Sequence, residues 1–553
     1  MAEQKTSDLM EKIVSLCKRR GLIFQSSEIY GGLNGFWDYG PLGAELKRNI
    51  KECWWRSMTQ LRDDVVGLDA SIIMHPKIWE ASGHTSTFSD LMVDCLLTKK
   101  RFRADQVEPQ SGTAYFYTGA TDGTSAKESK DAFSALIATG KHAEYARKVA
   151  KQFYQQRGIE NPALLGERTE EVKDSIRYNP ENGSLLTEPR PFNLMLKTYV
   201  GPVESEDNKA YLRPETAQAI FVQFKNVLDV SRQRVPFGIC QIGKAFRNEI
   251  NPRNFTFRSR EFEQMELEFF IRPDEVVQKM SGAVAGLSDP QPSTLRSSVT
   301  EDGSTLNPQP NWGWELWHKY WVEQRLKWYE SIGLGRDTLV EYWQKKEELA
   351  HYARATVDIL FKFPFGTQEL EGIAARGNFD LTQHQKFSGK SMEYFDEEAK
   401  AKYVPHVIEP SAGVDRLALA LICNAYCEDQ APDEKGKLES RVVMKFHPRI
   451  APIKVAVFPL LKNKPALVEK AKAVRDLLRP HMSVFYDEAG AIGRRYRRQD
   501  EAGTPFGVTI DFDTLGEQGP ELQDTVTLRD RDTMKQERVK IGDLVSILVE
   551  KIR

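Results

Sequence analysis

The pattern of apolar and polar residues changes along the chain, and each change marks a different predicted element. Apolar residues recur at helical spacing over residues 9–16, which predicts an amphipathic helix. From residue 449 onward, a buried run at 453–460 is followed by a helical pattern at 466–478. Further short strands are expected at 484–486, 507–511 and 525–528. This alternation of strands and a helix indicates a separate α/β domain.

Two stretches with a two-residue period lie on either side of a polar loop in the middle of the chain. Residues 239–249 and 260–270 are predicted to form antiparallel strands joined by the loop 251–259. The first strand would place Arg247 and Glu249 on one face. One face of the second strand would carry Arg260, Phe262, Gln264 and Glu266.

A face of this composition points to a ligand site, because polar groups are costly to bury unless a ligand or an ion satisfies them. The alternative is a solvated outer face above Met265, Leu267 and Phe269. A solvated face, however, has no need of Phe262 in its middle.

Two further stretches have the character of binding elements. In residues 409–421 a turn of small residues opens a helix whose first turn carries Arg416. A helix N-terminus favours anions, and an arginine there adds a bidentate phosphate donor; the alternative is an ion pair with Asp415. Residues 39–49 are predicted to be a proline-broken entry into a helix from about Leu42 to Thr59.

The segments between these stretches differ in composition. Residues 106–190 are polar and rich in Lys and Glu, which predicts an inserted helical subdomain. Residues 281–310 are rich in Ser, Pro, Gly and Thr, which predicts a long mobile connection. The helix expected after it holds tryptophans at three-, four- and seven-residue steps, which favours a packed seam over a nucleic-acid stacking platform. The expected division of the chain is 1–105, 106–190, 191–272, 273–350, 351–448 and 449–553.

Composition excludes several classes. The chain has 553 residues with 40% hydrophobic and 28% charged residues, and its net charge is −2, so nucleic acid would have to bind at local patches. No apolar run is long enough for a membrane helix. The six cysteines form no CxxC pair, so we expect reduced thiols, no zinc and a cytoplasmic protein. The GxxxxGK[ST], GxGxxG and HExxH motifs are absent.

Taken together, the three chemical stretches resemble the signature motifs of class II aminoacyl-tRNA synthetases. The proline-bearing helix corresponds to the first motif, the hairpin with Phe246, Arg247 and Glu249 to the second, and the helix start at 413–416 to the third. The resemblance implies an α+β catalytic domain with an antiparallel sheet flanked by helices, inserted helical segments, and a C-terminal α/β anticodon-binding domain.

Longer segments narrow the resemblance to the homodimeric type of glycyl-tRNA synthetase. These segments are WEASGHTSTFSD at 79–90, RFRAD at 101–105, LRPETAQ at 212–218, ELEGIAARGNFDLTQH at 369–384 and EPSAGVDR at 409–416. Two positions depart from that family's pattern, Thr367 in place of tryptophan and Arg376-Gly377-Asn378 in place of Arg-Thr-Asp/Asn. Since neither changes a charged group, we expect altered packing and retained activity.

The resemblance implies an activity in which glycine is attached to tRNA(Gly) through glycyl-adenylate, with ATP as a substrate and Mg²⁺ as a cofactor. The implied catalytic residues are Arg247, Arg258 and Arg416. The implied ATP-binding residues are Arg247, Asn248, Glu249, Phe257, Arg258, Phe262, Glu369, Leu370, Gly413 and Arg416, and Glu369 is the candidate Mg²⁺ contact. The implied glycine-binding residues are Arg103, Glu215, Phe262, Glu263, Gln264, Met265, Glu266, Glu409, Ser411 and Gly413.

The implied partners are tRNA(Gly), glycine, ATP and a second copy of the chain, with no membrane. In the C-terminal domain, a basic run at 494–498 is interpreted either as a phosphate contact or as a solvated helix face. Two other functions remain as alternatives, a non-catalytic binding protein on this scaffold and a small-molecule ligase that uses no tRNA. The complete arginine set argues against the first, and the C-terminal domain argues against the second.

Overall fold

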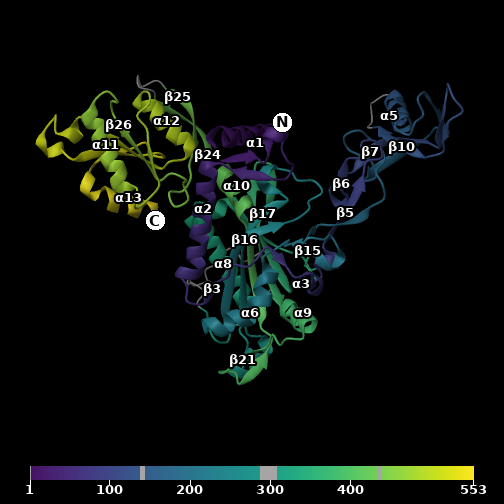
Figure 1. Ribbon diagram of the computed structural model, residues 1–553, viewed down its shortest axis with the longest axis horizontal. Helices are drawn as coiled ribbons and strands as arrows, with labels where there is room; N and C mark the ends of the chain where they lie inside the picture. The colour runs from purple at the N-terminus through teal and green to yellow at the C-terminus, as the bar shows by residue number, and fades with distance from the viewer. Residues whose placement is uncertain (1, 138–142, 287–307, 433–437) are drawn as a thin grey trace. The chain divides into compact units, whose positions relative to one another are not determined.

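The computed structural model describes residues 2–137, 143–286, 308–432 and 438–553, so most of the connection expected at 281–310 lies outside the described residues. The chain forms two compact units. The first comprises residues 1–82, 198–246 and 253–553, and the second comprises residues 83–197 and 247–252. Figure 1 shows the ribbon coloured along the sequence.

A seven-stranded sheet is the framework of the first unit, in the order β18-β19-β20-β23-β17-β16-β3. Its pairs are antiparallel except for β16 and β3, which run parallel. The strands are β3 (Val65–Gly67), β16 (Phe237–Phe246), β17 (Glu261–Ile271), β18 (Leu339–Trp343), β19 (Ala355–Phe363), β20 (Gly366–Gly377) and β23 (His406–Gly413).

The predicted hairpin is formed by β16 and β17, whose register pairs Gln241 with Glu266 and Ala245 with Phe262. The predicted strand at 239–249 is too long at its end, however. Since β16 ends at Phe246, Arg247 and Glu249 lie in the connection and do not share a strand face. The connection includes a short 3₁₀ helix at Phe255–Phe257.

Helices α2 (Pro41–Trp55), α8 (Trp314–Ser331) and α10 (Val414–Ala425) pack on one face of this sheet. Pro41 occupies the first turn of α2, where its missing N–H costs nothing. The packed tryptophan seam is confirmed, since Trp321 is 1% exposed and its ring contacts Phe269 of β17. The segment expected as a second insertion therefore contributes α8 and the edge strand β18 to the same core.

Helices α6 (Ala217–Ser231) and α9 (Phe379–Ser388) cover the opposite face. Because strand side chains alternate, the even-numbered residues of β17 point toward α6 and α9, and the odd-numbered ones toward α2, α8 and α10. Shorter elements of this unit are α1 (Ala2–Arg20), β1 (Ile23–Gln25), β2 (Trp37–Tyr39), β4 (Ile73–Met74), α3 (Pro76–Ala81), β15 (Lys209–Leu212), α7 (Asp274–Ser281), β21 (Tyr394–Asp396) and β22 (Ala401–Tyr403).

The second unit corrects the helical prediction for 106–190. In its described residues, 106–137 and 143–190, that segment holds one α-helix, α5 (Ala143–Gln155), among strands β7 (Gln110–Tyr117), β8 (Gly119–Asp122), β9 (Glu128–Ser129), β10 (Phe133–Ile137), β11 (Pro162–Leu165) and β12 (Arg168–Ser175). The charged sequence of β12 favours a helix, but backbone pairing with β7 overrides this preference and leaves its side chains largely exposed. Strands β5 (Ser89–Asp94), β6 (Arg101–Arg103) and β13 (Arg190–Asn193) complete a further small sheet of this unit.

The predicted C-terminal strands and helix are confirmed. A five-stranded sheet has the order β27-β26-β28-β29-β30, with β26 parallel to both of its neighbours. The strands are β26 (Val455–Pro459), β27 (Val484–Tyr486), β28 (Phe506–Ile510), β29 (Thr525–Asp530) and β30 (Gln536–Lys540), and the helices are α11 (Pro465–Leu478), α12 (Ile492–Ala502) and α13 (Leu544–Ile552). A hairpin of β24 (Tyr426–Pro432) and β25 (Leu438–Met444) precedes this domain.

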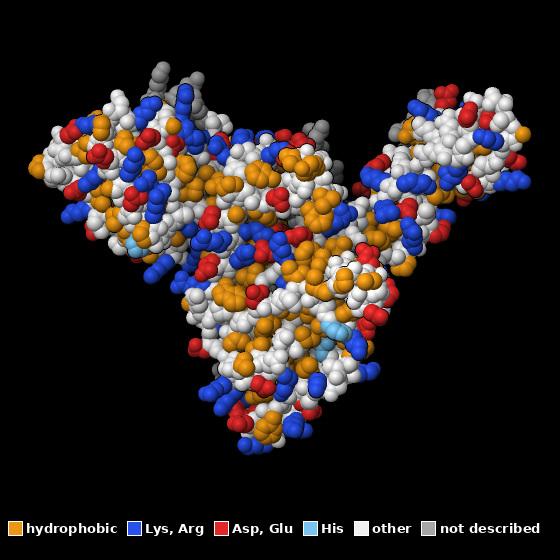
Figure 2. Space-filling model, in the orientation of Figure 1, with side chains coloured by type: hydrophobic (Ala, Val, Ile, Leu, Met, Phe, Trp, Pro, Cys, Tyr) orange, Lys and Arg blue, Asp and Glu red, His pale blue; other side chains and the backbone are white. Residues whose placement is uncertain are grey.

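Charged side chains of both signs are interspersed over the face of the C-terminal domain that Figure 2 shows. This distribution agrees with the net charge of −2. Any nucleic acid bound there must therefore find local groups of cations rather than one basic field.

Candidate active site

Glu266 is held at the centre of the sheet by two hydroxyl groups. It lies on β17 opposite Ser411 of β23, and the Ser411 Oγ donates to its Oε1 at 2.8 Å. The Thr216 hydroxyl donates to the other carboxylate oxygen. Glu266 is only 2% exposed, and burial together with the Glu215 carboxylate raises its pKa. A carboxylate fixed in this way is ready to accept a bond from a cation.

Glu409 is held by an arginine that sequence reasoning did not select as a site residue. The Arg376 Nη1 donates to the Glu409 Oε1 at 2.7 Å. The same guanidinium donates to both oxygens of Asp380 at 2.9 Å. Burial raises the pKa of Glu409 despite this arginine, and the Glu266 and Glu215 carboxylates add to the shift. Arg376, which the family pattern shares, is thus a central residue of the site, and the departure from that pattern lies at the next residue, Gly377.

Gln218 of α6 connects Glu215 to the same network. Its Nε2 donates to the Glu215 Oε1 at 3.0 Å and to the Asp380 Oδ1 at 2.9 Å. Its Oε1 lies 2.8 Å from the His384 Nε2. Burial lowers the pKa of His384, so the imidazole is a neutral partner that orients the amide.

Three carboxylates crowd together on this side of the sheet. One oxygen from each of Glu266, Glu268 and Glu409 lies within 4.8 Å of the others. We call these three residues the acidic cluster. Burial raises the pKa of Glu268 well above its ordinary value, and the facing Glu409 adds to the shift. The negative charge of these carboxyl groups is larger than the positive charge of the Arg376 guanidinium beside them. The cluster can therefore hold a small cation such as an ammonium group.

A second group of predicted residues surrounds Arg416, which lies at the start of α10, directly after β23. The other members are Phe257 and Glu369. The Arg416 Nη1 donates to the Glu369 Oε2 at 3.1 Å, and the Arg416 Nε donates to the Phe257 carbonyl at 3.3 Å. Its guanidinium also lies 4.7 Å from the centre of the Phe257 ring. Arg416 is 27% exposed and Glu369 is 48% exposed at their side chains, so both can reach a ligand.

Some predicted residues lie elsewhere. Glu263 lies on the opposite face of β17 from Glu266, where Lys47 and Lys51 pair with it at 2.8 and 2.9 Å. Met265 is buried on that same face, and Leu370 is buried in the core. The structure therefore does not bring these three into the acidic cluster. Gln264 lies on the Glu266 face, 3.4 Å from the Ser411 hydroxyl, and Phe262 is half-buried further along the same face, with Gly413 directly before α10.

Four predicted residues belong to the second compact unit and are described within it. The Arg247 guanidinium lies over the Phe88 ring at 5.4 Å. The backbone of Asn248 donates to the Leu194 carbonyl at 2.8 Å, and that of Glu249 to Arg247 at 2.7 Å. Arg103 pairs with two carboxylates, Asp105 at 2.6 Å and Asp90 at 3.0 Å. Of the three predicted catalytic arginines, Arg258 and Arg416 belong to the first unit and Arg247 to the second.

Sequence reasoning missed the residues that support the acidic cluster. These are Thr216, Gln218, Arg376 and Asp380, and Glu268 of the cluster itself was missed as well. One signal was available, since Glu266 and Glu268 are two positions apart in a predicted strand and must share a face. The pairing of Arg376 with Glu409 carries no such local signal, because 33 positions separate them.

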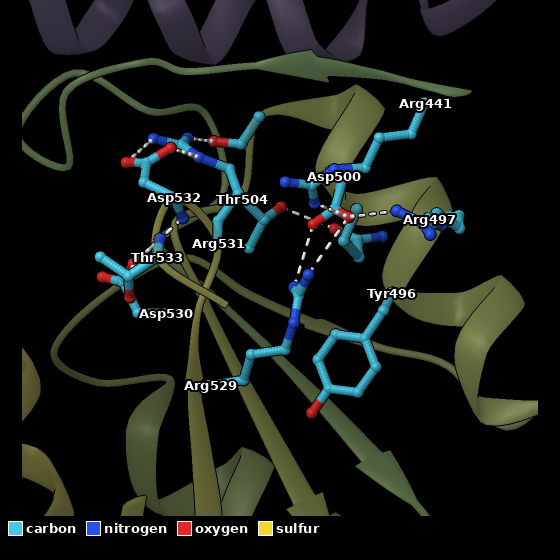
Figure 3. A network of polar contacts seen from close by, with 12 residues as sticks. Arg441, Tyr496, Arg497, Asp500, Thr504, Arg529, Asp530, Arg531, Asp532 and Thr533 are labelled. Carbon is cyan, nitrogen blue, oxygen red and sulfur yellow. Dashed lines mark hydrogen bonds and ion pairs between the residues drawn. The ribbon is translucent and has the colours of Figure 1, made fainter. Parts of the chain in front are cut away.

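The basic run of the C-terminal domain is mostly occupied by internal bonds. The buried Arg495 donates to the Gly490 carbonyl, and Arg498 pairs with Asp487. Arg497 lies 3.9 Å from Asp500, the centre of the network in Figure 3. Arg494 is exposed and has no partner in the described part of the chain, so it is the member of the run that can meet a ligand.

Asp500 joins the hairpin before the C-terminal domain to the sheet of that domain. It accepts from Arg441 of β25 at 2.7 Å and from Arg529 of β29 at 3.0 Å (Figure 3). Arg441 also pairs with Asp429 of β24 at 2.6 Å. Asp500 is 1% exposed, and its charge is matched by arginines. This network is therefore a structural joint rather than a binding site.

Comparisons with known proteins agree with this architecture. A class II tRNA synthetase core domain (G, H, P, S and T) matches residues 201–289, and an anticodon binding domain matches residues 454–551. The fold and the site thus define a class II aminoacyl-tRNA synthetase, as the motifs predicted.

Full-length relatives give the family. The chain is 44% identical over 590 residues to the glycine–tRNA ligase of Rhodopirellula baltica, covering 98% of this chain and 99% of the relative. It is 46% identical over 572 residues to that of Thermus thermophilus, with 98% and 99% covered, and 44% identical over 549 residues to that of Thermobifida fusca, with 99% and 98% covered. The chain belongs to the glycine–tRNA ligase family.

Proposed function

We propose that this chain attaches glycine to tRNA(Gly) in two steps, forming glycyl-adenylate from ATP and then transferring glycine to the 3′-terminal adenosine of the tRNA. The observation that carries the proposal is the buried acidic cluster. It offers an ammonium site in a sheet whose neighbouring helix start presents Arg416. An amino acid and a nucleotide are the two ligands that such a pair of sites would take.

The first step needs no general base. The glycine carboxylate is already an anion and attacks the α-phosphorus of ATP, expelling diphosphate. Catalysis then consists of in-line positioning and stabilisation of the developing charge. Arginines supply this charge, and we assign the outer phosphates to Arg258 and Arg416 and the α-phosphate to Arg247.

Glycine is recognised through its ammonium group. Glu266 and Glu409 lie close enough together for both to accept from one cation, and Ser411 holds Glu266 in place. Glu215, positioned by Gln218, completes the anionic surroundings. Fixing the ammonium in this way sets where a β-carbon would project, so that packing can exclude every larger amino acid.

Magnesium fits beside Arg416. Mg²⁺ prefers one or two carboxylates together with substrate phosphates, and the Glu369 carboxylate is accessible at 48% exposure. Glu369 would hold the ion, which supplies charge neutralisation for the phosphates when bound. The salt bridge between the Glu369 carboxylate and the Arg416 guanidinium, at 3.1 Å, holds the two side chains next to each other before a nucleotide binds.

The remaining assignments concern the organisation of the chain. Residues 1–105, 191–272 and 351–448 are assigned to the catalytic domain, 106–190 and 273–350 to insertions, and 449–553 to anticodon binding. The protein is assigned as a cytoplasmic homodimer that pairs through α2. In the described residues, no helix combines the length and apolar character needed to cross a membrane.

Pyrophosphate exchange into ATP, measured with each amino acid in turn, tests the proposed function. Exchange that depends on glycine, followed by charging of a tRNA(Gly) transcript, is the expected result. Exchange with a different acid alone would overturn the substrate assignment. Pyrophosphate exchange without charging of the tRNA would favour a small-molecule ligase. The absence of any exchange would favour a non-catalytic binding protein.

A further inference from the structure

Glu268 is a buried acid for which the proposed reaction has no role. It follows Glu266 by two positions on β17, so both side chains lie on the same face. The register of β17 and β23 pairs Glu266 with Ser411 and Phe269 with Ile408, which places Glu268 opposite Glu409. Its side chain is 0% exposed. Two acids therefore face each other across neighbouring strands inside the protein.

The three acids of the cluster differ in what satisfies them. Glu266 accepts from two hydroxyl groups, and Glu409 accepts from the Arg376 guanidinium. Neither carboxyl oxygen of Glu268 has a hydrogen-bond partner within the described ranges of the chain. One of its oxygens lies within 4.8 Å of those of Glu266 and Glu409. An unsatisfied carboxyl group thus points into the cluster.

The surroundings of Glu268 cannot balance another negative charge. The groups that act on it are Glu409 of β23, Arg376 of β20, Glu266 of its own strand and Asp380 of α9. On the other side, β16 offers only the apolar Ile239 opposite it. If every acid were ionised, four negative charges would face one positive charge. A buried group in this situation takes up a proton instead.

We propose that Glu268 is a positioning residue that stays neutral and whose O–H group donates to the cluster, orienting the Glu409 carboxylate toward the ammonium group of the substrate. The proton belongs to Glu268 rather than to Glu409, because only Glu409 has a guanidinium at 2.7 Å. A protonated carboxyl is the one form of this side chain that has a donor. Identifying the ammonium as that of glycine rests on the proposed function.

The neutral state has a consequence for stability that does not depend on activity. The pKa of Glu268 is raised in the folded protein, so its stabilising contribution is complete below the ordinary glutamate value. It is lost progressively as pH rises from there through the folded pKa, because unfolding releases the proton. In E268Q the group cannot release a proton. The unfolding constant of the wild type, divided by that of E268Q, should therefore rise about tenfold per pH unit above roughly pH 5.

Denaturant unfolding of both proteins between pH 5 and pH 8 measures this ratio. The control is E263Q, on the same strand but on the opposite face, where Lys47 and Lys51 hold the pKa of Glu263 below its usual range. The ratio for E263Q should stay flat over the same interval. A flat ratio for E268Q as well would mean that folded Glu268 is ionised and would overturn the proposal. This result can be obtained even if the protein does not act on glycine.

Kinetics test the positioning role. In E268L, which has neither donor nor charge, the KM for glycine in pyrophosphate exchange should rise about 10- to 100-fold while the KM for ATP stays within twofold. The neutral amide of E268Q should recover most of this loss. If E268Q is as impaired as E268L, the charge is what matters, and the neutral assignment fails. If both variants bind glycine as the wild type does, Glu268 does not orient the site. Absence of glycine-dependent exchange in the wild type would instead refute the proposed function.

Discussion

The acidic cluster and the Asp500 network are both groups of buried charges, but their balance differs. Around Asp500, the arginines Arg441, Arg529 and Arg497 face the aspartates Asp429 and Asp500. Around the acidic cluster, the Arg376 guanidinium acts on Glu266, Glu268 and Glu409 and also pairs with Asp380. Every acid of the first group has an arginine partner. The second group has more acids than cations and needs either a proton or a further cation.

This difference separates a structural joint from a binding site. Breaking a balanced pair leaves a buried charge without a partner, so the effect appears in stability. Removing one acid from a site with excess negative charge relieves repulsion within the free protein, so the effect appears in ligand binding. Burial alone does not distinguish the two regions, because Asp500 is 1% and Glu266 is 2% exposed.

The largest effect is expected at the joint. Asp500→Ala leaves Arg441 and Arg529 without their shared acceptor and should lower the free energy of unfolding by about 3–5 kcal/mol. Pyrophosphate exchange should be unchanged at a temperature where the variant is folded. The control is Asp532→Ala, since Asp532 is 45% exposed and Arg531 keeps its bonds to two carbonyls. Denaturant unfolding of both measures the contrast, and equal losses would contradict it.

The next effect concerns an arginine that is paired but accessible. Arg416→Ala removes a donor that can move from Glu369 to phosphate, and exchange should fall about 10²–10³-fold in kcat with little change in stability. The matched control is Arg336→Ala, an arginine of similar exposure that pairs with Glu323 and Glu330. Loss of folding or of the native oligomer in Arg416→Ala would show that Arg416 belongs with the structural joints instead.

The smallest effect is expected at Arg494, where a charge has no internal partner in the described residues. Arg494→Ala should leave glycine-dependent exchange unchanged and weaken tRNA binding slightly. The slope of log affinity against log salt should fall by about one, because one phosphate contact is lost. Arg479→Ala, which removes an exposed arginine already near Asp476, is the comparison. Identical salt slopes for Arg494→Ala and the wild type would remove the phosphate assignment.

Local periodicity predicted much of this fold. The hairpin of β16 and β17, the helix start at Arg416 and the buried tryptophan seam follow from short local patterns, and the C-terminal α/β domain follows from the alternation of such patterns over residues 449–553. The segment 106–190 could not be predicted in the same way, because β12 has a charged sequence and is specified by pairing with β7.

The candidate site was predicted only in part for a related reason. Glu266, Glu409 and Ser411 lie within recognisable motifs, but the bonds that hold them join distant segments. Arg376 meets Glu409 only because β20 and β23 are neighbours in the sheet. The resemblance implied Glu263 as a glycine contact, yet the alternation that places Glu266 on the site face directs Glu263 toward Lys47.

One measurement tests most directly whether the excess of acid in the core is there to hold an ammonium group. Pyrophosphate exchange is measured with glycine and with glycolate, which has a hydroxyl in place of the ammonium and the same carboxylate. We predict that kcat/KM for glycolate is lower by about 10³-fold or more, because the acids then lack their cation. If glycolate supports exchange within about tenfold of glycine, the acidic cluster does not bind the substrate's ammonium group.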